Sequence, residues 1–455
     1  MSYPFVPKIN TITFNEIIKQ THNLFENLPD SRKGAPQTKY SVKDAALSAL
    51  SIFFMQCPSF LSYQRDMQEK KGTNNAKSLF LIDNIPSDNW IRTLLDPVQP
   101  KYFFPLFDYI FEILKQTNNL DKYKSINGNL LIPLDGTGYF SSNTIHCNKC
   151  SIKKHKNGTL SYSHSVITPV IVSPNHNNVI SLEPEFIFPQ DGHKKQDCEN
   201  AAAKRWILKY SKPYNEIGAT ILGDDLYSRQ PLCELILDEK LNFIFVCKPK
   251  SHKTLYEWID FLKTGSITTV KTKHCKGKKT RIYTYRFVND VPLRDSDDAL
   301  KVNWCELTIT NEKGKDTYKS SWITNHLIKT ENIVEIVKAA RARWKIENEN
   351  NNTLKTKGYN LEHNFGHGKE NLSSTLVTLN LLAFLLHTLM DMMDSRYQLI
   401  RQRLGTRKTV FQDFRALTRY LVFDSWDDLL IFMMEKLEII QNLANSNEII
   451  IFDTG

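Results

Sequence analysis

The chain has 455 residues, enough for about two to four domains, and 41% of them are apolar, as in an ordinary globular protein. Lysine and arginine total 59 against 49 aspartates and glutamates. The net charge of +10 favours a polyanionic partner such as nucleic acid, although it also fits a merely basic protein. The eight scattered cysteines argue against a disulfide scaffold and for a reducing compartment.

We expect no segment of this sequence to enter a membrane. Met1 leads into polar residues rather than into the apolar run of a signal peptide. The most apolar stretch, residues 381–390, is shorter than a membrane span and contains His387. The sequence therefore predicts a buried helix there and no membrane partner.

The N-terminal part of the chain is predicted to be helical. Apolar residues recur at three- and four-residue spacing in residues 15–28, 41–55 and 101–120. Ser41, followed three residues later by Asp44, resembles a capping box at the start of one of these helices.

The pattern then changes to that of a sheet protein. Runs rich in Ile, Val and Leu at 129–135, 165–173 and 178–188 predict three strands. A helical pattern at 196–211, a strand at 219–224, a helix at 230–240 and a strand at 241–249 follow. This order predicts an α/β arrangement around one core sheet.

Residues 255–324 alternate apolar and polar side chains and predict a small antiparallel β unit. From about residue 330 to 443 the pattern is helical again. The β unit contains a basic stretch that suits either phosphate contact on a hairpin or a solvated loop. Its positions that can carry positive charge are Lys271, Lys273, His274, Lys276, Lys278, Lys279 and Arg281.

Two aspartates stand where predicted core strands end. Asp135 follows the first strand, and Asp224, with Asp225 beside it, follows the fourth. If the two strands are neighbours, these carboxylates converge at one edge of the sheet, where ligands of α/β proteins bind. Carboxylates that converge repel one another unless a cation such as Mg²⁺ or Mn²⁺ lies between them. The alternative is that each aspartate caps a helix or forms a turn.

A third acid lies on the helix predicted after residue 330. Four residues at helical spacing form one apolar stripe: Ile333, Val337, Ala340 and Trp344. At about 100° per residue, Glu347 borders this stripe, whereas Glu349 falls on roughly the opposite face. Arg343 lies one turn before Glu347 and can pair with it. The sequence leaves open a buried Arg–Glu bridge and a metal ligand held by that arginine.

These residues resemble those of bacterial insertion-sequence transposases of the DDE class. Asp135 in LDGTGYF stands where that family has its first aspartate, and Asp224, followed by Tyr227, stands where it has its second. Asp225 does not fit that spacing. The family's signature Tyr-x2-Arg-x3-Glu-x6-Lys is matched at Arg343 and Glu347. Ala340 and Leu354 occupy the Tyr and Lys positions, so half of the signature is absent.

The resemblance implies an α/β fold with a ribonuclease-H-like mixed sheet core, a β-rich insertion and helical N- and C-terminal regions. The implied domains are a DNA-binding region (1–125), the core in two parts (126–254 and 327–394), the insertion (255–326) and a C-terminal region (395–455). Asp135, Asp224 and Glu347 would be the catalytic residues and would hold two Mg²⁺ ions, or Mn²⁺, with Asp135 shared. Implied DNA contacts are Arg343, Lys355, Lys357, His363, His367 and Lys369.

The implied activity is metal-dependent cleavage of DNA at the ends of the element and transfer of those ends into target DNA. The partners would be terminal inverted repeats, target DNA and a second copy of the chain, at the nucleoid in a bacterial cytoplasm. Two alternatives remain, namely a DNA endonuclease without strand transfer and a non-catalytic basic DNA-binding protein. They differ in Mg²⁺-dependent nicking and in the joining of ends.

One close cysteine pair, Cys147 and Cys150, stands apart from these motifs. A single C-x-x-C is half of a zinc site, and His155 and His164 follow within the same segment. Either the two cysteines bind Zn²⁺ together with one or two of these histidines, or they are free thiols on a turn.

Overall fold

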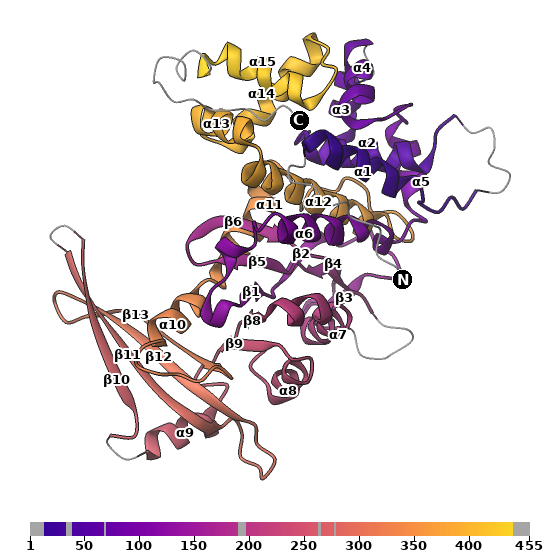
Figure 1. The fold of residues 1–455 in the computed structure, drawn as a ribbon. Coiled ribbons are helices and arrows are strands. Elements are labelled where there is room, and N and C mark those ends of the chain that lie inside the picture. Colours follow the sequence, from indigo (N-terminus) through magenta and orange to yellow (C-terminus); the bar gives the residue numbers. More distant parts are fainter. Residues whose placement is uncertain are drawn as a thin grey trace. The chain divides into compact units, whose positions relative to one another are not determined.

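The computed structural model describes residues 13–32, 39–67, 70–189, 197–262, 265–276 and 279–439 (Figure 1). Lys278 of the basic stretch and residues 440–455 of the predicted C-terminal region lie outside these ranges. The chain divides into two compact units. Unit 1 comprises residues 1–119, 138–165 and 352–455, and unit 2 comprises residues 120–137 and 166–351.

Unit 2 is built on five core strands of a nine-stranded sheet. Their order across the sheet is β6-β5-β1-β8-β9. β1 pairs antiparallel with β5 and parallel with β8, and β8 pairs parallel with β9, so the predicted sheet is mixed. In chain order the strands are β1 (Leu130–Pro133), β5 (Val170–Ser173), β6 (His176–Ser181), β8 (Ala219–Gly223) and β9 (Asn242–Val246).

β1 and β8 lie at the centre of this sheet because both are continuous apolar runs. Every residue of the two strands is buried, as expected for strands that are covered on both faces. Pro133 pairs in register with Leu222, and the Leu134 N–H donates to the Leu222 carbonyl at 2.9 Å. The two strands therefore end at the same edge, where Asp135 and Asp224 follow them.

Helices connect the core strands of unit 2. The longest, α7 (Glu199–Ile217), buries one face through Ala202, Ala203 and Trp206, and Gly218, whose φ of +81° favours glycine, ends it just before β8. α8 (Gln230–Asp238) connects β8 to β9. The remaining short elements of this part are η2 (Asp121–Tyr123), η3 (Ile126–Gly128) and β7 (Glu185–Ile187).

The antiparallel strands predicted between residues 255 and 324 are present and extend the core sheet. α9 (Lys253–Phe261) comes first, and β13 then pairs antiparallel with β9. Long hairpins join the four strands in chain order, and they occupy the lower left of Figure 1. The strands are β10 (Thr268–Lys276), β11 (Lys279–Pro292), β12 (Lys301–Asn311) and β13 (Asp316–Thr324).

The helix predicted to carry Glu347 is interrupted. α10 (Ile333–Arg341) ends before it, and the chain continues as a π-helical turn, η4 (Ile346–Asn351). The buried stripe is confirmed up to Ala340, but Trp344 is 57% exposed, so that part of the prediction is wrong. A period of 100° per residue does not continue past Arg341, and Ile346 takes the next buried position.

Unit 1 is mostly helical, with a small sheet in the order β2-β4-β3. α12 packs on α2, and the Phe54 ring contacts Phe14, His387, Phe411 and Trp426. The helices are α1 (Phe14–Phe25), α2 (Val42–Phe54), α3 (Phe60–Met67), α4 (Lys70–Phe80), α5 (Asp88–Leu95), η1 (Pro100–Phe103), α6 (Pro105–Gln116), α11 (Asn352–Thr356), α12 (Leu372–Met393), α13 (Ser395–Leu404), α14 (Arg407–Tyr420) and α15 (Trp426–Lys436). The strands are β2 (Gly136–Ser142), β3 (Ser151–Lys154) and β4 (Leu160–Ile167). The sequence pattern had predicted only residues 165–167 of β4, as the start of the run 165–173.

Two local predictions in unit 1 can be compared with the structure. The Ser41 side chain caps α2 by accepting the Asp44 N–H at 2.9 Å, whereas the Asp44 side chain accepts the Asp83 N–H at 3.0 Å, so the capping box is only half formed. α12 is apolar and long enough to cross a membrane, yet 89% of its most apolar window is buried within the protein. The prediction of a buried core helix around His387 is therefore confirmed.

Candidate functional site

The acidic site begins at the end of β1, where Asp135 leaves the core. Its Oδ2 accepts a hydrogen bond from the Asn351 side chain at 3.0 Å. Burial, followed by the nearby carboxylates of Glu199, Glu347 and Asp224, raises the pKa of Asp135 to about 7, and the Arg343 guanidinium offsets part of that shift. Asp135 therefore lies close enough to Glu347 and Asp224 for their negative charges to disfavour its ionised form.

Glu199 is a fourth acid at this site, and it was not among the predicted residues. Its carboxylate accepts the Gly136 N–H at 3.2 Å and the Tyr227 hydroxyl at 2.6 Å. A Cβ at Gly136 would lie 2.6 Å from Glu199 Oε2, so a larger residue there would displace the Glu199 carboxylate. Burial and then Glu199 raise the pKa of Tyr227 well above its usual value, which keeps the hydroxyl a hydrogen-bond donor. In the sequence Glu199 looked like an ordinary acid in the first turn of a helix.

Glu347 lies on the π-helical turn η4 and pairs with Arg343 at 2.7 Å. The Arg343 side chain is 11% exposed, whereas the Glu347 side chain is 45% exposed. The structure therefore contains the Arg–Glu pair that the sequence suggested, with the carboxylate open to solvent rather than sealed in the core. The negative charge of Glu347 also helps to raise the pKa of Asp135. Glu347 therefore pairs with Arg343 and still acts on Asp135.

Two asparagines that follow Glu347 in η4 connect this turn to the core sheet. The Asn351 side chain donates to Asp135 and accepts from the Thr168 hydroxyl at 2.9 Å. Asn350 donates to Thr168 at 3.1 Å and to Asn351 at 3.0 Å. This network fixes the carboxylate of Asp135 relative to the turn that carries Glu347. Nothing in the sequence distinguished these two asparagines from their neighbours in the run ENENNN.

The adjacent aspartates Asp224 and Asp225 have different partners. Asp224 accepts the Leu226 N–H at 2.8 Å and contributes to the raised pKa of Asp135. Asp225 accepts the Lys248 N–H at 2.6 Å and the Ser251 hydroxyl, so it holds the loop that follows β9. Asp224 therefore belongs to the acidic group, and Asp225 has a structural role.

The predicted DNA-contacting residues of unit 1 are mostly at its surface. Lys357, His363 and Lys369 are exposed, and Lys355 is paired with Glu362 at 2.8 Å. Leu354, at the position of the signature lysine, is fully buried in unit 1. A lysine at this position would bury its charge.

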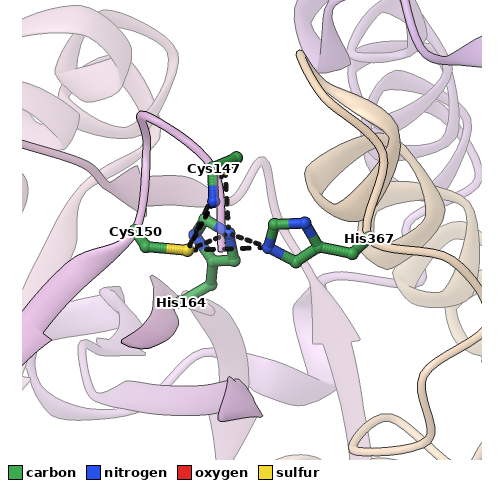
Figure 2. Close-up of side chains that lie close together, drawn as sticks. All are labelled: Cys147, Cys150, His164 and His367. Carbon is green, nitrogen blue, oxygen red and sulfur yellow. Dashed lines mark hydrogen bonds between the residues drawn. The ribbon is translucent and has the colours of Figure 1, made fainter. Parts of the chain in front are cut away.

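His367, also predicted as a DNA contact, lies in a cluster with Cys147, Cys150 and His164 (Figure 2). Their four ligand atoms all lie within 4.8 Å of one another. His155, which the sequence suggested as a fourth ligand, is exposed and bonds to the Ser161 hydroxyl at 2.9 Å instead. Its place is taken by a histidine more than 200 residues away in the chain, at 367.

The cluster is the one set of three or more potential metal ligands, among the residues that the structure describes, whose donor atoms lie together in this way. Because the carboxylates of the acidic site do not meet this spacing, their oxygen atoms lie farther apart than the ligands of a single ion. Two ions about 4 Å apart need a wider set of ligands than one ion does. The oxygen donors of Asp135, Asp224, Glu347 and Glu199 are of the kind that hard divalent cations such as Mg²⁺ bind.

Comparison with known proteins gives little further information. No family model and no curated protein match the chain. Among solved structures it is similar to a piggyBac transposase, seen by cryo-EM in a synaptic complex with hairpin DNA. The two chains are 11% identical, the alignment covers 97% of this chain and 84% of that chain, and the TM-score is 0.40.

Proposed function

We propose that this chain is a DNA transposase of the DDE class, which cleaves DNA at the ends of an element and joins those ends to target DNA. The proposal is supported most by the raised pKa of Asp135, to which the negative charges of Glu347 and Asp224 contribute. These three residues lie far apart in the sequence. The mixed sheet also has its first and fourth core strands side by side, with an aspartate after each. That arrangement is expected of a ribonuclease-H-like core.

In this proposal Asp135, Asp224 and Glu347 hold divalent cations, and Glu199 adds negative charge beside them. Two Mg²⁺ ions, or Mn²⁺ in their place, would supply Lewis acidity to a scissile phosphate and lower the pKa of the attacking hydroxyl. Arg343 orients Glu347 through its ion pair, and Asn351 orients Asp135. Water would displace the 3′ oxygen at the end of the element. The freed 3′ hydroxyl would then displace a 3′ oxygen in the target, so no nucleotide cofactor is needed.

The positive charge of the chain fits a DNA substrate. The net charge is +10, and exposed Lys271, Lys273 and Arg281 lie on the β10–β11 hairpin. On this proposal the helices within residues 1–125 bind the end of the element, two copies of the chain hold two ends together, and the protein acts at the nucleoid of a bacterial cell.

The proposal is tested with supercoiled DNA that carries the sequences flanking the coding region. Purified protein should nick this DNA at defined positions only when Mg²⁺ or Mn²⁺ is present, and should join the freed ends to a second plasmid. Nicking without joining would identify the endonuclease alternative. Binding without any metal-dependent nicking would contradict the proposal and favour a non-catalytic DNA-binding protein.

Asn351→Ala is expected to raise the Mg²⁺ concentration for half-maximal cleavage by about 10- to 100-fold, because Asp135 loses the donor that fixes its carboxylate. Asn351 is a positioning residue, so DNA affinity measured without metal should not change. The neighbouring Asn352 is exposed, and Asn352→Ala serves as the matched control. An unchanged Mg²⁺ dependence in a folded Asn351→Ala protein would remove this role.

The double substitution of Lys271 and Lys273 by alanine tests whether the hairpin binds DNA phosphates. If both lysines do so, the slope of log K against log salt should become shallower by about 1.8, because each neutralised phosphate contributes roughly 0.9 to that slope. Lys301→Ala is the control, because that lysine of the same sheet is already paired with Asp290 at 3.4 Å. A slope equal to that of the unaltered protein would identify the stretch as a solvated loop.

A further inference from the structure

The cluster of Cys147, Cys150, His164 and His367 is unrelated to the acidic site and has the composition of a metal centre (Figure 2). The cysteines lie on the turn between β2 and β3, His164 lies on β4, and His367 lies on the segment that leads into α12. All four belong to unit 1. The distances between their donor atoms distinguish a coordination sphere from a group of neighbouring polar side chains.

The distances between the donor atoms fit a tetrahedral zinc ion. A tetrahedral Zn²⁺ with Zn–S of about 2.3 Å and Zn–N of about 2.05 Å places two sulfurs about 3.8 Å apart, sulfur and nitrogen about 3.6 Å apart, and two nitrogens about 3.3 Å apart. The two Sγ atoms are 3.9 Å apart, and the two Nε2 atoms are 3.1 Å apart. Three sulfur–nitrogen distances are 3.6, 3.4 and 3.5 Å. Five edges of the tetrahedron therefore match a zinc site to within about 0.2 Å.

The sulfur separation also excludes a disulfide, because bonded sulfurs lie about 2.05 Å apart. The Cys147 N–H points to Cys150 Sγ at 3.4 Å, and the Cys150 N–H donates to the Cys147 carbonyl at 3.1 Å. This turn brings both sulfurs to one side of the backbone. N–H donors of this kind stabilise thiolate ligands.

His367 is held in the orientation that coordination through Nε2 requires. Its Nδ1 lies 3.0 Å from the Gly368 carbonyl, which accepts the Nδ1 proton and leaves the Nε2 lone pair for a metal. The ring packs on Phe140, with 4.4 Å between centroids. His164 stacks on Tyr139 at 5.6 Å, so both imidazoles are fixed by aromatic neighbours.

We propose that Cys147, Cys150, His164 and His367 bind one structural Zn²⁺ ion that fastens the segment before α12 to the β2-β4-β3 sheet. Four protein ligands fill a tetrahedral shell and leave no position for substrate, which is the mark of a structural rather than a catalytic site. Two thiolates with two imidazoles select zinc over the oxygen-preferring Mg²⁺. The centre is independent of the proposed DNA chemistry.

A zinc ion would hold in place a segment that has no regular secondary structure of its own. Residues 357–371 contain no helix or strand, and three glycines, Gly358, Gly366 and Gly368, have positive φ. The Lys149 ammonium donates to the Asn371 side chain at 2.5 Å, so one further contact joins the same two parts of unit 1. A metal that joins such a segment to a sheet contributes its binding free energy to folding.

The test is elemental analysis of the full-length protein purified without chelator, which should contain about one equivalent of zinc. X-ray absorption should give two sulfurs at about 2.3 Å and two nitrogens at about 2.05 Å. Cys150→Ser and His367→Asn should each lose most of the metal. The control substitutions are His155→Asn, in the turn between β3 and β4, and His363→Asn, on the same segment as His367, and both should keep a full equivalent.

His367→Cys addresses the risk that His367→Asn fails to fold, because a thiolate can replace the imidazole and should retain the zinc. Zinc well below half an equivalent in the unaltered protein, even after exposure to ZnCl₂, would overturn the proposal and leave two free thiols. Full zinc in a folded His367→Asn protein would also overturn it. None of these readouts depends on DNA cleavage, so the zinc centre and the transposase proposal can fail separately.

Discussion

Replacing Asp224 by asparagine is expected to lower metal-dependent DNA cleavage on the order of 10³-fold or more, because one carboxylate ligand of the ions is removed. The same change one residue later should have little effect on the activity of the folded protein. Asp225 accepts hydrogen bonds from Lys248 and Ser251 and acts on the loop after β9, so Asp225→Asn should instead lower the melting temperature.

This pair of variants is well matched, since both remove one charge from neighbouring positions at the end of β8. Cleavage and melting temperature should be measured on both proteins, together with DNA affinity in the absence of metal. Asp224→Asn should bind DNA as tightly as the unaltered protein or more so, because the repulsion of phosphate is reduced. Equal loss of cleavage in the two variants, at equal stability, would show that the effect is not specific to Asp224.

The second large effect is expected on stability, from substitution of Asp96 by alanine. The Asp96 carboxylate lies at the start of α12 and accepts N–H groups from Lys369, Glu370, Asn371 and Leu372 at 2.9 to 3.2 Å. Removing it leaves these donors without their anion and should cost roughly 2–4 kcal/mol of unfolding free energy, towards the lower end because the site is partly open to water. Chemical denaturation measures this difference.

The stability lost in Asp96→Ala should also depend on pH. Burial raises the pKa of Asp96, but the N–H donors lower it by more, so the folded pKa lies below the usual value of about 3.9. The stabilisation is therefore complete above about pH 4 and is lost as the pH falls through the lower folded pKa. The stability difference between the unaltered protein and Asp96→Ala should be constant from about pH 6 to 8 and should shrink below about pH 4.

Asp88→Asn is the control for Asp96. Asp88 lies on the same helix, α5, and pairs with Arg92 at 3.0 Å in a partly exposed ion pair. Such pairs contribute about 0–1 kcal/mol, so this variant should lose little stability. If Asp96→Ala is no less stable than Asp88→Asn, or if its deficit is the same at pH 3 as at pH 7, the cap on α12 does not have the role described.

Local sequence patterns predicted much of the fold. The apolar runs of β1, β5, β6, β8 and β9 were long enough to identify the core sheet, and the period-two alternation identified the antiparallel strands that extend it. β2, β3 and most of β4 were missed because their residues are largely polar and half exposed, so they show no apolar pattern. Trp344 was placed wrongly because nothing local indicates that α10 gives way to a π-helical turn.

A site residue could be predicted from the sequence only where its role shows in the residues next to it, and not where its partner is distant along the chain. Asp135 and Asp224 became candidates because a carboxylate directly after a buried strand is a local signal. Glu199 and Asn351 did not, because each takes its role from a partner more than 60 residues away. The same holds for His367, whose neighbours in the sequence suggested contact with DNA and whose partners in space are two cysteines and a histidine. Asp96 ends one helix and caps another, which no local pattern reveals.

The most direct test of the central claim is an anomalous scattering map of crystals grown with Mn²⁺ and with DNA from the flanks of the coding region. Manganese peaks are expected between Asp135, Asp224 and Glu347, with a phosphate of the DNA beside them. Manganese absent from these three carboxylates, in protein that nicks the same DNA in the same buffer, would contradict the central claim.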